Sequence, residues 1–215
     1  MEIAFNYENF FDRTIYSSIA HAIFVLAHPF FDYEQSWDGL NYSYISDSSR
    51  GVVSFDPHNR IAVGAARNET GARMLQFANV PALRCFHGAP ETVIGLADRE
   101  TLEYLYVLVG RKKRRMITTA CWLVNDTLCS HDSQEDFIKH GGEFLAEIMF
   151  ADNLSDYWKE AYEWNNNEWE EADRLFRLFK SGQRQLKAEE ILGWHQYPKG
   201  REACVTSLEE IGFQI

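Results

Sequence analysis

Two Cys-x-His pairs are the residues of this chain whose types are best suited to metal or nucleophilic chemistry. They are Cys85 with His87 and Cys129 with His131, and Cys121 lies between them in the sequence. Thiolate and imidazole bind zinc, and the same two groups can act as a nucleophile and its base. Structural zinc ligands are usually separated by about two to four residues, however, and a single intervening residue aligns both side chains only in a strand. We therefore expect no metal and no cofactor.

Other catalytic signatures are absent from the sequence. It contains no glycine-rich phosphate loop, no His-Glu-x-x-His motif and no Gly-x-Ser-x-Gly motif. We accordingly favour a role other than catalysis. An enzyme of unrecognised type that uses the Cys and His residues, with or without a metal, is kept as an alternative.

Residues 143 to 173 combine acidic and aromatic side chains. The segment holds ten acids and one base, Lys159, so it carries −9 of the net charge of −11. Its seven aromatic rings are those of Phe144, Phe150, Tyr157, Trp158, Tyr162, Trp164 and Trp169. Aromatic residues are enriched in protein interfaces, and acidic charge speeds the encounter with a basic partner. The other interpretation is a solvated helix face whose rings point inward.

Within this segment the sequence predicts a partner-binding surface. Asp152, Asp156, Glu160 and Glu163 step by four, four and three residues, so a continuous helix would present them as one ridge. Like charges at this spacing repel one another, and a basic partner would relieve the repulsion. The residues that we expect to bind the partner are Glu160, Glu163, Trp164, Glu168, Trp169, Glu170 and Glu171.

A basic run, residues 111 to 115, contains five consecutive Arg and Lys residues. Such a run can contact RNA, phosphate or an acidic protein, but it is more often a solvated turn. The net charge of −11 also argues against direct nucleic-acid binding. We expect a basic turn here, which could also dock on the acidic segment of the same chain.

Composition and hydropathy favour a cytoplasmic protein. The N-terminus has an acidic residue at position 2 and lacks the positively charged start and unbroken apolar run of a secretory signal. The longest apolar stretch, residues 19 to 31, is too short and too polar to span a membrane. The four Cys residues show no disulfide framework, so we expect buried thiols.

Hydrophobic periodicity predicts the elements that position these residues. Apolar residues at spacings of three and four predict a helix over 8–28, closed by Pro29. Segments 41–45, 51–55 and 61–65 are typical of strands, and the last two flank a turn. We expect a helix over 91–109 and a strand or an apolar helix over 116–124. Further helices are predicted over 134–150, 155–164, 168–181 and 187–193, and near 207–211.

These elements indicate an α+β fold. A small antiparallel β-meander, about residues 41–66, is expected to pack against several α-helices, and the C-terminal third is mainly helical over 134–193. No Pro-, Gly- or Ser-rich boundary divides the chain, so a single domain over residues 1–215 is expected.

Segments 36–42, 47–55 and 61–67 resemble a strand pattern of small bacterial proteins. The pattern, an aromatic-Gly-Asn-Tyr group followed by Arg-Gly, is similar to that of toxin-immunity and related families, and it covers about 30 residues of 215. In such a meander Gly39 and Gly51 would supply turns, while Trp37 and Tyr42 would pack against the sheet. The resemblance implies a cytoplasmic protein that binds a toxin domain.

The sequence thus leads to an immunity-type or inhibitory protein. Its acidic, aromatic-rich surface would bind and neutralise a toxin domain with a basic surface, such as a nuclease. It would not bind nucleic acid directly or associate with a membrane. Besides the enzyme, a structural subunit of a homo-oligomer is an alternative, and the sequence leaves the oligomeric state open.

Overall fold

The computed structural model of the protein describes residues 1–46, 48–69 and 80–215. Its chain forms two compact units. The first comprises Met1–Phe11 and Leu40–Phe150, and the second comprises Asp12–Gly39 and Ala151–Ile215. The single domain expected from the sequence stays a prediction. Asp47, in the segment that resembles immunity proteins, lies outside the described residues.

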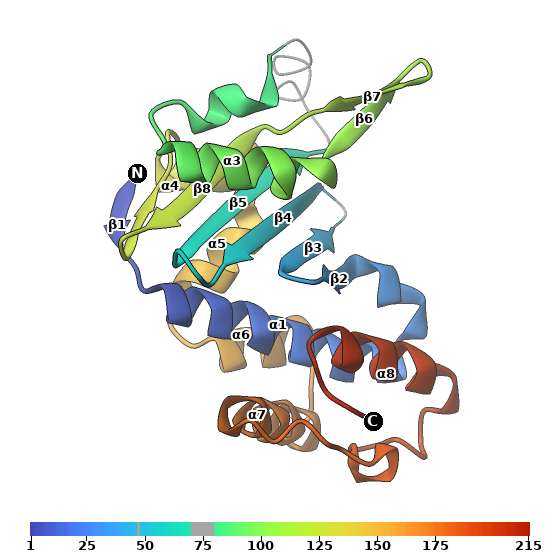
Figure 1. Ribbon diagram of the computed structural model, residues 1–215. Helices are drawn as coiled ribbons and strands as arrows, with labels where there is room; N and C mark the ends of the chain where they lie inside the picture. Colours follow the sequence, from blue (N-terminus) through green and yellow to red (C-terminus); the bar gives the residue numbers. More distant parts are fainter. Residues whose placement is uncertain (47, 70–79) are drawn as a thin grey trace. The chain divides into compact units, whose positions relative to one another are not determined.

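An antiparallel sheet with the strand order β1-β9-β8-β5-β4-β3-β2 is the central element (Figure 1). The strands are β1 (Glu2–Ala4), β2 (Gln35–Asp38), β3 (Asn41–Ile45), β4 (Ser49–Asp56), β5 (Ile61–Asn68), β8 (Thr119–Val124) and β9 (Thr127–Cys129). Strands β3, β4 and β5 are the predicted meander, in which Val53 pairs with both Tyr42 and Gly64. The predicted α+β class is therefore confirmed, although the sheet extends beyond the meander.

Helices of the first unit cover both faces of its sheet. Helix α3 (Glu91–Arg99) lies over one face and α5 (Glu143–Phe150) over the other (Figure 1). The core on the α3 side includes Val63, Ala65, Phe86, Val93, Leu96, Ala120 and Trp122. On the α5 side the ring of Tyr44 stacks on that of Phe144, with 4.3 Å between centroids. Alternate residues of the strands therefore face different helices.

Gly51 lies inside β4 and not in a turn, contrary to the role that the resemblance implied. Its partner across the strand pair is Tyr44, whose ring lies over it. A Cβ atom at Gly51 would come within 2.6 Å of the Tyr44 ring. The glycine is therefore required by a close side-chain approach. Gly39, in contrast, has a φ of +62° between β2 and β3, as a turn glycine does.

The helix predicted over 91–109 is wrong in its second half. Helix α3 ends at Arg99, a 3₁₀ turn η3 (Thr101–Glu103) follows, and Tyr106–Val109 forms strand β6. Strand β6 pairs with β7 (Lys112–Arg115), so most of the predicted basic turn is a strand. Three of the four residues of β6 are β-branched or aromatic, and Gly110 makes the turn with a φ of +64°.

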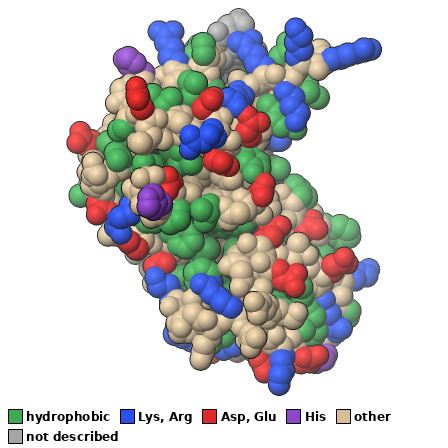
Figure 2. All heavy atoms as spheres, viewed as in Figure 1, with side chains coloured by type: hydrophobic (Ala, Val, Ile, Leu, Met, Phe, Trp, Pro, Cys, Tyr) green, Lys and Arg blue, Asp and Glu red, His purple; other side chains and the backbone are tan. Residues whose placement is uncertain are grey.

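Two basic residues of β7 have contacts within the first unit. Arg115 forms ion pairs with Asp98 and Glu103 of the first unit. The ammonium of Lys113 lies 4.2 Å from the centroid of the Tyr106 ring. Figure 2 shows Lys and Arg side chains along this hairpin.

The helix predicted over 134–150 is also interrupted. It consists of α4 (Gln134–Phe137), a π-helical turn η4 (Ile138–Gly142) and α5. Gly141 has a φ of +102°, which kinks the chain between the two α-helices. Ser133 caps α4 by accepting a hydrogen bond from the backbone N–H of Asp136.

Helices dominate the second unit. They are α1 (Tyr7–Ala27), whose residues from Asp12 onward belong to this unit, α6 (Leu154–Ala161), α7 (Asn166–Ser181) and α8 (Arg201–Glu210). The 3₁₀ turns η1 (Pro29–Glu34), η5 (Ala188–Glu190) and η6 (Pro198–Gly200) also belong to this unit, whereas the 3₁₀ turn η2 (Ala82–Phe86) belongs to the first. The predicted helix over 8–28 and its end before Pro29 are confirmed. In the part of the chain that the structure describes, no helix has the length and apolar character needed to span a bilayer.

Indole and phenol groups link the helices of the second unit. Trp158 Nε1 donates a hydrogen bond to Ser17 Oγ at 3.0 Å, and Trp37 Nε1 donates to Ser18 Oγ at 2.7 Å. The Tyr16 hydroxyl donates to Asp173 Oδ1 at 2.7 Å. Buried Trp and Tyr residues need such partners because their polar atoms have lost water. Trp37 is buried, with 8% exposure.

His21, buried in α1, makes the stability of the second unit sensitive to pH. Burial lowers the pKa of its imidazole from 6.5 to about 4. The unfolded chain therefore binds one proton more than the folded chain between these two values, and stability falls as the pH drops through this window. Between pH 7 and pH 4.5 we expect a loss of about 2–3 kcal/mol from this group.

The measurement is urea unfolding of the protein and of a His21→Gln variant at both pH values. Since carboxylates titrate in the same range, only the difference between the two proteins reports on His21. An equal loss in both proteins would contradict the assignment.

Candidate functional site

The acidic-aromatic segment does not form one surface. Its first eight residues belong to α5 in the first unit, and the remainder, from Ala151, belongs to the second unit. Of its seven rings, Trp158 and Trp164 are buried and the other five are half-buried. The rings therefore point inward, as in the second of the two interpretations of the sequence.

Four of the seven residues predicted to bind a partner have contacts within the second unit. Trp164 is buried, with 8% exposure. Trp169 Nε1 donates a hydrogen bond to Ser155 Oγ, and Lys159 lies 4.6 Å from the centroid of its ring. Glu168 accepts a hydrogen bond from the backbone N–H of Asn165 and completes the capping box of α7.

Glu171 is held most firmly of the seven. It is 7% exposed, and its carboxylate accepts hydrogen bonds from Arg174 Nε and Nη2 at 2.6 and 2.7 Å. The backbone N–H of Leu192 donates to the same group at 3.1 Å. This carboxylate ties α7 to the segment that follows it.

The other three predicted residues, Glu160, Glu163 and Glu170, are exposed. The predicted ridge of Asp152, Asp156, Glu160 and Glu163 does not form, because α6 begins at Leu154 after its Asn153 cap and ends at Ala161. Glu163 lies beyond the helix with a φ of +51°. The part that the seven predicted residues play in binding a partner stays a prediction.

Exposed aromatic rings of the second unit occur instead in η1, where we define the η1 surface as Phe30, Phe31, Asp32 and Tyr33. Phe30 is 84% exposed, Tyr33 61% and Phe31 41%, and Asp32 is exposed between them. The ring of Phe31 packs against that of Phe24 with 5.7 Å between centroids, which anchors the turn to α1. Pro29 ends the helix, so the two following Phe residues cannot continue its buried face. That position after a helix end is the signal that the sequence analysis did not use.

A polar groove lies beside the η1 surface. It is lined by Asp32 of η1 and by Lys199, Glu202 and Glu210 near and along α8, and its volume is about 340 Å³. Burial raises the pKa of Glu210, and the backbone N–H of Trp37, which donates to this carboxylate at 2.8 Å, opposes that shift. Figure 2 shows acidic and apolar side chains side by side in this part of the second unit. The groove therefore adds acidic charge next to exposed rings.

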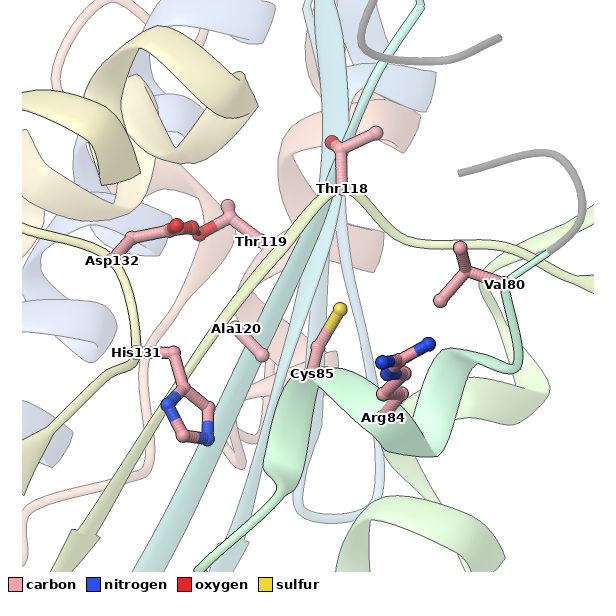
Figure 3. Close-up of a pocket in the computed structure, with 8 residues that line it drawn as sticks. All are labelled: Val80, Arg84, Cys85, Thr118, Thr119, Ala120, His131 and Asp132. Carbon is pink, nitrogen blue, oxygen red and sulfur yellow. Dashed lines mark hydrogen bonds between the residues drawn. The ribbon is translucent and has the colours of Figure 1, made fainter. Parts of the chain in front are cut away.

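A separate cavity of about 270 Å³ lies in the first unit. Figure 3 shows the residues that line it: Val80, Arg84, Cys85, Thr118, Thr119, Ala120, His131 and Asp132. They come from η2 and the segment just before it, from the start of β8 and the residue before it, and from the residues that follow β9. The sheet therefore brings together three segments that are far apart in the sequence.

Asp132 is the acidic group of this cavity. Its Oδ2 accepts a hydrogen bond from Thr119 Oγ1 at 2.5 Å, and its backbone N–H donates to Ser130 Oγ at 3.1 Å. His140 Nδ1 lies 3.4 Å from the same carboxylate oxygen, but it is buried without a hydrogen-bond partner among the described residues. The carboxylate is therefore fixed by Thr119, and the His140 ring lies beside it.

Two residues of the Cys-x-His pairs also lie at this cavity. Cys85 and His131 line it, and His131 Nε2 contacts the backbone carbonyl of His87. The rings of His87 and His131 are stacked with 6.0 Å between centroids. Cys121 does not join them, because it is buried on the opposite face of the sheet near Leu145. In the described ranges no group of three or more His, Cys, Asp or Glu residues could hold a metal ion.

The thiols of Cys121 and Cys204 are unsuited to nucleophilic chemistry. Burial raises the pKa of each to about 12, which keeps both protonated at neutral pH. All four cysteines are free thiols, but only Cys121 and Cys204 are buried, whereas Cys85 and Cys129, also expected to be buried, are half-buried.

Comparison with protein-family models, with curated proteins and with solved structures finds no match to this chain.

Proposed function

We propose that the protein binds a basic protein partner through the η1 surface and the acidic groove beside it. The observation that carries the proposal is the set of three exposed rings, with Phe30 at 84%, next to acidic side chains. Exposed aromatic residues of this kind are the usual anchors of protein interfaces, because they bury much area at little cost in conformational entropy.

Charge supports the same class of partner. The second unit has seventeen acidic residues and nine Lys and Arg residues, so it carries −8 of the net charge of −11. Glu160, Glu163 and Glu170 add exposed acidic charge to it. A basic surface would gain in association rate and specificity from this field.

The more specific proposal is an immunity-type protein that acts in the cytoplasm. Its partner would be a toxin domain with a basic active site, such as a nuclease, which the bound protein would cover. The resemblance of segments 36–42, 47–55 and 61–67 to immunity families supports this class of function, and the toxin would be the product of a neighbouring gene.

The test is calorimetric binding to the product of the neighbouring gene at low and high salt. A Phe30→Ser, Tyr33→Ser double variant should weaken binding by about 1,000-fold, because each anchor contributes on the order of 2 kcal/mol. Reversing Glu160, Glu163 and Glu170 to Lys should weaken binding less and should flatten its salt dependence. Leu192→Ser is the matched control, since Leu192 is an apolar residue of the same unit with 38% exposure outside the η1 surface.

Several results would count against the proposal. One is a partner that has no basic surface or an affinity that does not depend on salt. Another is a concentration-dependent dimer in sedimentation that the Phe30→Ser, Tyr33→Ser variant converts to a monomer, since the η1 surface would then close a homo-oligomer. Equal weakening by Leu192→Ser would place the interface elsewhere.

A further inference from the structure

The cavity of the first unit has groups of opposite charge on two sides. In Figure 3 Asp132 and Thr119 lie on one side of it, and Arg84 and Val80 lie on the other. From this arrangement we infer that the cavity binds a small zwitterion, with its ammonium group against Asp132 and its carboxylate or other anionic group against Arg84. This site is independent of the η1 surface, which belongs to the other unit.

The Asp132 side is oriented before any ligand arrives. Thr119 Oγ1 fixes one carboxylate oxygen, and the bond from the Asp132 backbone to Ser130 Oγ fixes the main chain. Ser130 Oγ in turn donates to the carbonyl of Ala120 at 2.7 Å, so the loop is tied to β8. An oriented carboxylate binds an ammonium group without a further loss of side-chain freedom. Since the Asp132 side chain is only 18% exposed, the attraction is screened less than at the surface.

The Arg84 side supplies a guanidinium. Arg84 lies in the 3₁₀ turn η2 and is exposed, and it forms no ion pair with any of the described residues. A guanidinium presents several N–H donors in one plane, which matches the two oxygens of a carboxylate. Because it is at the mouth of the cavity, it can meet the anionic end of a ligand whose amine lies deeper.

The space between the two charged groups is small and largely apolar. Val80, Cys85 and Ala120 line it, and its volume of about 270 Å³ is below the range of about 300–1,000 Å³ that is typical of drug-sized ligands. An amino acid with a short methylene chain fits these limits, whereas a nucleotide or a peptide of several residues does not. The lining therefore selects a small molecule with two charged ends and an apolar middle.

The experiment is isothermal titration of the full chain with ω-amino acids of increasing length, from glycine through β-alanine and 4-aminobutyrate to 5-aminopentanoate. The primary amine and the carboxylic acid of matching length serve as one-ended probes. One amino acid of the series should bind at least about tenfold more tightly than either matching one-ended probe, since each charged contact contributes more than about 1.4 kcal/mol.

Two variants assign the two ends. Arg84→Gln should remove the preference for the amino acid over the amine, and Asp132→Asn should remove its preference over the carboxylic acid. Arg84 is exposed, so its replacement leaves the fold intact, and thermal unfolding of both variants checks this point. Lys187→Gln, at an exposed cation of the other unit, is the matched control.

The inference would be overturned if no amino acid bound more tightly than its one-ended probes. It would equally fail if Arg84→Gln, in a folded protein, left the preference unchanged. Loss of partner binding by the η1 variants bears on the proposed function alone, and loss of zwitterion binding bears on this cavity alone.

Discussion

Replacing Gly200 with alanine is expected to unfold the second unit, with a loss of about 4 kcal/mol or more. Gly200 is the last residue of η6 and directly precedes α8. A Cβ atom there would come within 2.6 Å of the Cα, carbonyl carbon and carbonyl oxygen of Leu26 in α1. Because all three are backbone atoms, no change of rotamer can relieve the overlap, and the two segments must separate.

The measurement is denaturation of the variant by urea and by heat. Gly95→Ala is the matched control, since the nearest atom to its added Cβ is the flexible guanidinium of Arg99 at 3.3 Å. Within helix α3 this exchange should be neutral or should stabilise the protein by about 0.5–1 kcal/mol. A Gly200→Ala variant as stable as the parent protein would show that the close approach to Leu26 does not exist.

The second large effect is expected for Glu171→Ala, a loss of about 2–3 kcal/mol. The substitution leaves Arg174 without its bidentate carboxylate and the backbone N–H of Leu192 without an acceptor. The value lies below the upper range for buried pairs because the Arg174 side chain is 36% exposed and can be solvated. Chemical denaturation measures the loss.

Glu170→Ala is the control for this substitution. Glu170 is the exposed neighbour of Glu171, and its replacement should change stability by less than about 0.5 kcal/mol. Comparison of the Glu171→Ala and Glu170→Ala variants also distinguishes a role of Glu171 in stability from a role in partner binding. If the Glu171→Ala variant kept its full stability but no longer bound the partner, Glu171 would belong to the binding surface, as the sequence predicted.

Local patterns in the sequence were sufficient to predict much of the fold. Helix α1 was predicted because its apolar residues recur at helical spacing over six turns and Pro29 stops them. The meander was predicted because three short β-prone runs are separated by turn residues. In the structure these runs pair with one another as neighbouring strands. In these segments the local conformational preference agrees with the tertiary structure, so one sequence is enough to predict the secondary structure.

Other elements depend on partners that a local pattern does not reveal. Strands β1 and β9 have three residues each and exist because each pairs with a distant segment, as Ile3 does with Leu128. Residues 106–109, predicted as the end of a helix, have an apolar character that fits either type of element, and the Gly110 turn decides between them. Pairing with a distant segment makes β1 and β9 strands, and β-prone residues next to the Gly110 turn make 106–109 a strand.

The candidate sites were predicted least well. The same stretch of sequence carries the charge and the aromatic rings, but the fold turns the rings inward and leaves most of the acids outside, as at Trp164 and Glu163, while Glu171 is buried. The η1 surface was missed because the residues after Pro29 were treated as the end of a helix. The cavity was missed because Arg84, Thr119 and Asp132 become neighbours only through the sheet.

The interleaving of the two units along the chain has a consequence for synthesis. The second unit is built from residues 12–39 and 151–215, and the whole of residues 40–150 separates its halves. A ribosome therefore releases the first half of this unit early, and Trp37, Ile23 and the apolar face of α1 then lack the helices that bury them. They stay exposed until α6, α7 and α8 have emerged, which makes this interval the stage at which the nascent chain most needs chaperone protection.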